Sequence, residues 1–173
     1  MIITNGESCM VEDVRSMDIT EEVMIKATPN RVYNAITNGI AAWWGTPYLY
    51  TRLTKDIVLE PKLGGRFYEV WGTGQGRLWG TVTQIKKNEW IMITGSLGMK
   101  GAVQGTICFA LEAKEGSTLV TLTHHAIGQI TEETKSGYVL GWKDLLGTRL
   151  KAFVEAGKKY GVGFNPPPGL HSN

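Results

Sequence analysis

The sequence predicts an α+β domain in which a curved antiparallel sheet of six to seven strands wraps around one long C-terminal helix, with two short helices after the first strand. Two observations predict this fold: successive segments of period-two alternation joined by short loops, and a change to helical spacing near the C-terminus. The chain has 173 residues, 42% of them hydrophobic and 20% charged, which is typical of one globular domain.

The first strand and the two short helices follow from local signals. Residues 19–27 alternate between apolar and polar side chains, which predicts a strand. Thr28 can cap a helix and Pro29 suits a first helical turn, so a short helix is predicted over 29–37. A second helical turn is expected over 40–44.

The middle of the chain reads as a β-meander, because short loops join neighbouring segments. The expected strands are 56–59, 66–72, 77–85, 89–97, 103–113 and 117–127. The glycine-rich run 72–76 resembles a phosphate-binding loop. It joins two strands and no helix N-terminus follows it, so it is interpreted as a hairpin turn.

The last predicted element is an amphipathic helix over 132–156, about 37 Å long, which Gly157 ends. Its apolar stripe contains Tyr138, Trp142, Leu145, Leu146, Arg149, Leu150 and Phe153. Residues 1–18 are expected to form a flexible leader, and 158–173, with three consecutive prolines, an extended or disordered tail. The predicted domain therefore spans 19–157.

Composition argues against several functional classes. The net charge of +2 and the lack of a basic cluster argue against a nucleic-acid partner. No apolar run is long enough for a membrane span, and the N-terminus lacks the pattern of a signal peptide. Two cysteines, Cys9 and Cys108, do not indicate a disulfide framework. The sequence predicts a reduced, cytoplasmic protein.

A single helix roughly 10 Å wide cannot fill a broad concave sheet, so a ligand pocket is expected beside it. The residues expected to line this pocket are those with inward parity on the strands or on the helix stripe, together with the tryptophans of the second helical turn. They are Trp43, Trp44, Phe67, Glu69, Trp71, Ile93, Gly95, Phe109, Val120, Leu122, His124, Tyr138, Trp142, Leu146 and Arg149.

Two of the expected pocket residues are candidates for acid/base catalysis, Glu69 and His124, because burial disfavours the charged form of such groups. Each has a simpler interpretation. His124 can be a hydrogen-bonded histidine at a strand end. Glu69 can pair with a basic group such as Arg66, Arg77 or Arg149, or its strand can face the other way. Arg149 in turn either anchors an anionic ligand or neutralises Glu69.

Other side chains are assigned to the opposite face of the sheet. Trp79 and Trp90 are expected to point outward, where they are candidates for a dimer surface. Adjacent strand residues such as His124 and His125 point to opposite faces, so the pair is not expected to chelate a metal ion. No cofactor is expected, because the phosphate-loop, nucleophile-elbow and Cys-x-x-Cys motifs are missing.

Several short motifs, in this order and spacing, resemble the SRPBCC or START-like superfamily, whose helix-grip fold is shared with birch-pollen-allergen-type proteins. They are the run 29–44, Gly64-Gly65-Arg66-Phe67, Gly80-Thr81-Val82, Leu122-Thr123-His124 and Gly141-Trp142. Within the superfamily the chain looks most like homologues of the heat-shock-protein ATPase activator domain, over about 19–157.

The resemblance implies three functions. The first is binding of a small hydrophobic or amphipathic molecule, such as a lipid, in the cavity. The second is a cyclase or dehydratase reaction, of the polyketide-cyclase type, that uses Glu69 or His124. The third is a co-chaperone-like or stress-response interaction, such as one with a chaperone partner, through the outer surface. Fold-level analogy alone does not choose among them.

Overall fold

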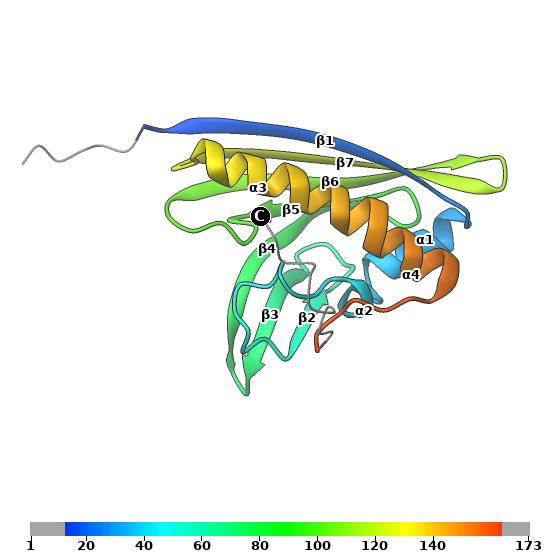
Figure 1. Ribbon diagram of the computed structural model, residues 1–173, viewed down its shortest axis with the longest axis horizontal. Coiled ribbons are helices and arrows are strands. Elements are labelled where there is room, and N and C mark those ends of the chain that lie inside the picture. The colour runs from blue at the N-terminus through cyan, green and yellow to red at the C-terminus, as the bar shows by residue number, and fades with distance from the viewer. Residues whose placement is uncertain (1–12, 164–173) are drawn as a thin grey trace, which may run out of the picture.

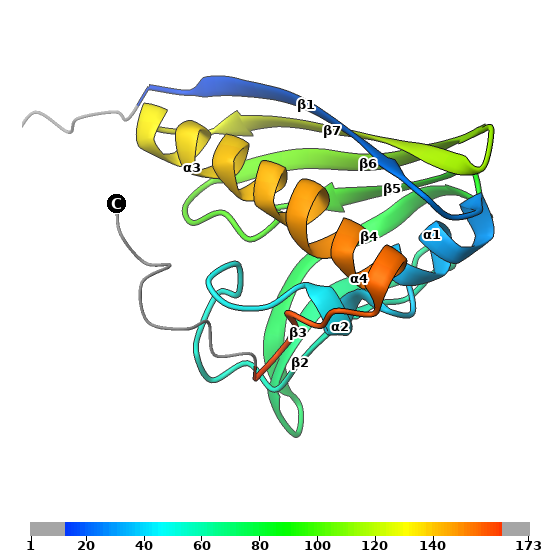
Figure 2. The ribbon, with the colours of Figure 1, turned by 45° about the vertical axis from the view of Figure 1, so that its right-hand side comes forward.

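The structure, a computed structural model, describes residues 13–163 and confirms the predicted α+β helix-grip architecture. Seven antiparallel strands in the order β1-β7-β6-β5-β4-β3-β2 form one curved sheet, and the C-terminal helix crosses one of its faces (Figures 1 and 2). The elements are β1 (Arg15–Ile25), α1 (Pro29–Ile36), α2 (Ile40–Trp43), β2 (Asp56–Leu59), β3 (Arg66–Gly72), β4 (Gln75–Lys86), β5 (Trp90–Gly95), β6 (Val103–Lys114), β7 (Ser117–Gly128), α3 (Glu132–Trp142), the π-helix η1 (Lys143–Leu150) and α4 (Lys151–Ala156).

Strand β1 begins at Arg15, so residues 15–18 belong to the sheet and not to the predicted flexible leader. Arg15 pairs with Gly128, and the ladder to β7 runs without interruption to Ile25. Met17 is fully buried and continues the inward parity of the strand, so these residues gain both ladder hydrogen bonds and apolar burial. Residues 1–12 of the predicted leader, which include Cys9, lie outside the described residues.

The C-terminal helix is continuous from Glu132 to Ala156, but its central eight residues form a π-helix. The predicted stripe is buried at Trp142, Leu145, Leu146, Arg149 and Leu150. The π-helix has more residues per turn than an α-helix, so the buried stripe shifts by one residue after it. Val154 is therefore buried in place of the expected Phe153. Gly157 ends the helix in a left-handed conformation with φ of 69°, as predicted.

The prediction that Trp79 points outward is wrong, because a β-bulge changes the parity of β4. Phe67 pairs with Gly80 and Tyr68 with Leu78, so Trp79 is the extra residue between them. The bulge directs the Trp79 side chain into the core, where the residue is only 6% exposed. It leaves Leu78 on the outer face of the sheet, where that residue is 54% exposed. Trp90 lies on the outer face of the sheet as expected, half-buried beside the ammonium of Lys86.

The first residues of the predicted tail pack against α2 and are ordered. The amide of Tyr160 donates to the carbonyl of Ala42 at 2.9 Å. Gly161 is buried against the same helix, where any Cβ would overlap the carbonyl oxygen of Ala41. Residues 164–173 lie outside the described part of the chain. Between residues 13 and 163 no helix combines the length and apolar character needed to cross a bilayer.

Candidate functional site

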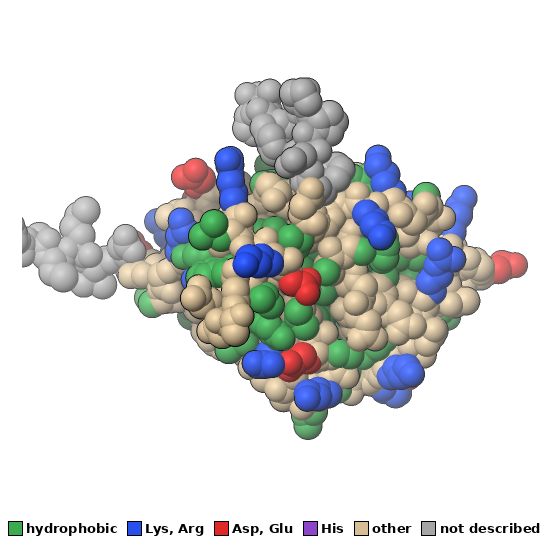
Figure 3. Space-filling view, turned by 90° about the horizontal axis from the view of Figure 1, so that it is seen from below, with side chains coloured by type: hydrophobic (Ala, Val, Ile, Leu, Met, Phe, Trp, Pro, Cys, Tyr) green, Lys and Arg blue, Asp and Glu red, His purple; other side chains and the backbone are tan. Residues whose placement is uncertain are grey.

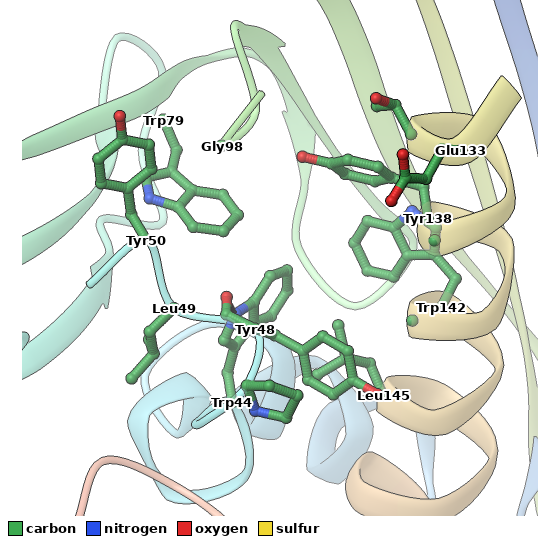
Figure 4. Close-up of a pocket in the computed structure, with 14 residues that line it drawn as sticks. Trp44, Tyr48, Leu49, Tyr50, Trp79, Gly98, Glu133, Tyr138, Trp142 and Leu145 are labelled. Atoms are coloured by element: carbon green, nitrogen blue, oxygen red, sulfur yellow. Dashed lines mark hydrogen bonds between the residues drawn. The ribbon is translucent and has the colours of Figure 1, made fainter. Parts of the chain in front are cut away.

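A cleft of about 470 Å³ lies between the first half of the C-terminal helix, the loop after α2 and strand β4 (Figure 4). We call it the aromatic cleft, because six of its fourteen lining residues are Trp or Tyr. The lining residues are Trp44, Pro47, Tyr48, Leu49, Tyr50, Trp79, Gly98, Glu133, Thr134, Gly137, Tyr138, Gly141, Trp142 and Leu145. The concave face of the sheet beneath the helix is filled by core side chains instead.

Of the two glycines on the helix wall of the cleft, Gly137 leaves open space and Gly141 permits the close approach of Tyr48. A Cβ at Gly137 would meet no atom within 4 Å. A Cβ at Gly141 would lie 3.2 Å from Cε1 of Tyr48, on the loop opposite. Directly after these glycines, Tyr138 and Trp142 extend from the helix toward the cleft (Figure 4). The helix therefore presents large rings separated by space, which suits a bound molecule better than a packed interface.

The loop wall is fastened to the helix by Arg149, Asp144 and Tyr48, which we call the Arg149 clamp. Nε of Arg149 donates to Asp144 at 2.8 Å, and Nη1 donates to the carbonyl of Thr46 at 3.0 Å. The Tyr48 hydroxyl donates to the same carboxylate at 2.9 Å. Burial, together with Asp144, raises the pKa of Tyr48 to about 12, so the phenol stays protonated and keeps donating. Arg149 is thus a structural anchor of the cleft.

Glu69 holds the same loop from the sheet side. Its carboxylate is fully buried and accepts hydrogen bonds from the Tyr50 amide at 2.6 Å, the Thr54 hydroxyl at 2.5 Å and the Trp71 indole at 3.2 Å. None of the expected arginine partners pairs with it, and Arg66 pairs with Glu60 at 2.7 Å. A buried carboxylate with three donors is stabilised without an ion pair.

His124 lies directly behind the cleft wall. Its Nδ1 accepts a hydrogen bond from the Trp142 indole at 3.0 Å, and its ring packs edge-on against Tyr138 at 5.3 Å. Burial lowers the pKa of His124 to about 4, with a smaller effect from His125, so the imidazole is neutral at pH 7. Because Nδ1 accepts, the ring proton is assigned to Nε2, which has no partner among residues 13–163.

The structure brings three of the predicted pocket residues, Trp44, Tyr138 and Trp142, into the cleft wall. Trp71 stacks on Tyr50 at 6.1 Å, next to the cleft. A Cβ at Gly95 would overlap the carbonyl oxygen of Trp79, so this glycine permits a close backbone approach and leaves no open space. The remaining apolar candidates lie in the packed core: Trp43, Phe67, Ile93, Phe109, Val120, Leu122 and Leu146.

Sequence reasoning missed the loop wall, Trp79 and the small residues of the helix. The loop residues 47–50 follow no periodic pattern, so nothing in their spacing assigned them a direction. Gly137 and Gly141 are four residues apart on one helix face, which is a signal that could have been used. For metals, residues 13–163 contain no group of three or more His, Cys, Asp or Glu side chains placed to hold an ion.

Comparisons with known proteins agree with this architecture. The solution structure of the Aha1 dimer from Colwellia psychrerythraea is similar with a TM-score of 0.59 and 26% identity, covering 82% of this chain and 98% of that chain. DynU16, from the dynemicin biosynthetic locus, has a TM-score of 0.61 at 17% identity, with 83% of this chain and 49% of that chain covered. CalU16 from Micromonospora echinospora has a TM-score of 0.56 at 15% identity, with 82% and 83% covered.

At these identities DynU16 and CalU16 indicate the shared fold alone. Comparison with curated proteins gives no match. The family model described as Activator of Hsp90 ATPase homolog 1-like protein matches residues 26–155, which is most of the chain and nearly all of the sheet and helix that form the cleft. The chain therefore belongs to the family of Activator of Hsp90 ATPase homolog 1-like proteins.

Proposed function

We propose that this protein binds a small apolar or amphipathic molecule in the aromatic cleft. The supporting observation is the cleft itself, about 470 Å³ with a wall rich in Trp and Tyr. That volume lies within the range of roughly 300–1,000 Å³ typical of small-molecule sites. Aromatic rings bind apolar ligands through large contact areas and well-defined geometry.

The polar atoms of the wall are mostly occupied within the protein. The indole of Trp44 donates to the Tyr48 carbonyl at 3.0 Å, and the hydroxyl of Tyr138 donates to the Leu97 carbonyl at 3.0 Å. The indole of Trp142 donates to His124. A ligand is therefore recognised mainly by its apolar surface, because these three groups have no free hydrogen-bond donor to offer it.

Binding is favoured over the alternative of a cyclase or dehydratase. An acid/base enzyme needs a titratable group in reach of the substrate. Glu69 already accepts three hydrogen bonds and lies outside the cleft lining. His124 is separated from the cleft by the rings of Tyr138 and Trp142, against which it packs.

Filling the cleft from the helix should block binding. Gly137→Leu places a side chain in open space at the cleft wall, so the affinity for the neutral dye Nile red should fall about tenfold or more. Fluorescence titration of the dye measures this. Leucine is a better helix former than glycine, so the variant is expected to fold.

Gly147→Leu is the matched control, because Gly147 is exposed on the same helix, has open space around it and does not line the cleft. It should bind the dye like the wild type. Equal dye affinity of the Gly137→Leu variant and the wild type would count against binding in the cleft.

We also propose that the chain forms a homodimer. The support is the Aha1 structure from Colwellia psychrerythraea, which is a dimer and is 26% identical over 82% of this chain. Sedimentation equilibrium should give the mass of two 19.0 kDa chains, with dissociation on dilution. A single-chain mass at every concentration up to about 100 μM would contradict the proposal.

A further inference from the structure

The wall around the aromatic cleft carries hydrogen-bond donors that lack acceptors. In the part of the chain that the structure describes, the buried side-chain polar atoms without a partner are Nε of Arg77, Nε1 of Trp79 and Nε2 of His124. Each can donate, since Nδ1 of His124 already accepts from Trp142. Trp79 lines the cleft, His124 packs behind its wall, and Arg77 stacks on the lining residue Tyr50. Buried polar groups are normally paired, so this excess of donors calls for an explanation.

Arg77 does not line the cleft itself but is held in a fixed position beside the lining residues Tyr50 and Gly98. Its Nη2 donates to the carbonyl of Met99 at 2.7 Å, next to the lining residue Gly98. Its guanidinium lies 3.9 Å from the centre of the Tyr50 ring. Its positive charge also reaches Tyr138, whose pKa burial raises to about 12 and Arg77 lowers by a smaller amount. The charge is therefore close to two residues of the cleft wall.

No carboxylate among residues 13–163 neutralises this arginine. Glu69 is its direct partner across the β3–β4 ladder and is the obvious counter-ion. However, the Glu69 carboxylate is directed to Tyr50, Thr54 and Trp71. A half-buried guanidinium without a counter-ion, stacked at the edge of an apolar cleft, is a suitable anchor for a bound anion.

The acidic residue of the cleft lies on the other wall. Figure 4 shows Glu133 on the helix beside Tyr138, whereas Tyr50 and Trp79 lie across the opening. On the underside of the molecule, both basic and acidic side chains lie around a central group of hydrophobic ones (Figure 3). The position of Glu133 favours an orientation with the negative end of a ligand toward β4 and away from Glu133.

Building on the proposed binding function, we infer that the ligand is an apolar molecule with an anionic oxygen group at one end, held by Arg77. The apolar body lies against Trp79, Tyr138 and Trp142. The unpaired N–H groups of Trp79 and His124 add positive potential to the wall without contacting the anion. The ligand class is therefore an apolar carboxylate or a similar oxyanion.

A matched pair of probes tests this assignment. Isothermal titration calorimetry with 1-naphthylacetate and its neutral analogue 1-naphthylacetamide should show about tenfold tighter binding of the carboxylate. Arg77→Met should abolish this preference, so that the variant binds the carboxylate and the amide with equal affinity. Arg66→Met is the control, because Arg66 is an exposed arginine on the neighbouring strand that also lies over a tyrosine ring, that of Tyr68. It should keep the preference.

The outcomes separate this inference from the proposed function. If wild type binds the two probes equally, Arg77 does not anchor an anion, while binding in the cleft stands. If the preference survives in Arg77→Met, the assignment to Arg77 is overturned. A preference that weakens in about 1 M salt in the wild type supports an exposed charge contact. Binding of neither probe overturns the inference, and failure of Nile red to bind would then overturn the proposed function as well.

Discussion

Lowering the pH from 7 to 4 should reduce the free energy of unfolding by about 3 kcal/mol through His124 alone. Its pKa is about 4 in the folded protein, mainly because of burial, against 6.5 for an unperturbed histidine. As the pH falls, the unfolded chain takes up the proton first. The contribution of His124 is thus fully present above pH 6.5 and is lost progressively down to about pH 4. Protonation of Nδ1 also removes the acceptor of the Trp142 indole.

Urea unfolding at a series of pH values measures this loss. His124→Gln is the informative variant, because the amide oxygen can accept from Trp142 but the side chain does not titrate. It should be less stable than the wild type at pH 7 and should lose less stability between pH 6.5 and 4. His125→Gln is the control, because His125 is exposed and contacts Asp18 on the outer face. If the His124 variant and the wild type lose stability equally, burial of a neutral imidazole is not the cause.

The fold was predictable because each element carries a local signal. The Thr28 cap, the glycine turns and the strand alternation lie close together in sequence, and β2 and β3 match their predicted bounds. Trp79 shows where this reasoning stops. Parity arguments assume an uninterrupted ladder, and the bulge between Phe67 and Tyr68 adds one residue to β4. A single insertion reverses the direction of every side chain on one side of it.

The candidate site was predicted only in part for a related reason. Trp142 and Tyr138 belong to a long periodic helix, so their direction followed from spacing. Most of the other predicted residues do point inward, but they fill the core, and inward direction alone does not distinguish packed from open space. The cleft arises where the loop 47–50 stands away from Gly137, and this depends on tertiary contacts from Glu69 and Arg149. Those contacts link residues distant in sequence, which periodicity does not reveal.

Arg149→Ala should lower the free energy of unfolding by about 3 kcal/mol or more and should also abolish dye binding in the aromatic cleft. The guanidinium is 7% exposed and satisfies Asp144 and the carbonyls of Gly45 and Thr46. Its removal takes the ion-pair partner from a partly buried carboxylate, which then keeps only the Tyr48 hydroxyl, and takes the donor from the Thr46 carbonyl. Each such loss is costly. The loop that carries Tyr48 would keep only the Tyr48–Asp144 hydrogen bond of the Arg149 clamp, so the cleft wall that it forms would no longer be held in place.

Two further variants separate the clamp from a general effect of losing an arginine. Arg66→Ala removes an exposed pair with Glu60, and exposed pairs contribute about 1 kcal/mol or less. Arg149→Lys keeps the charge but not the planar fork that reaches both Asp144 and Thr46, so its stability and dye affinity should fall between those of the wild type and the alanine variant. Chemical unfolding and Nile red titration measure the two effects. Full dye affinity in a folded Arg149→Ala protein would show that the loop wall holds its position without the clamp, because the cleft would then depend only on Glu69 and the core beneath it.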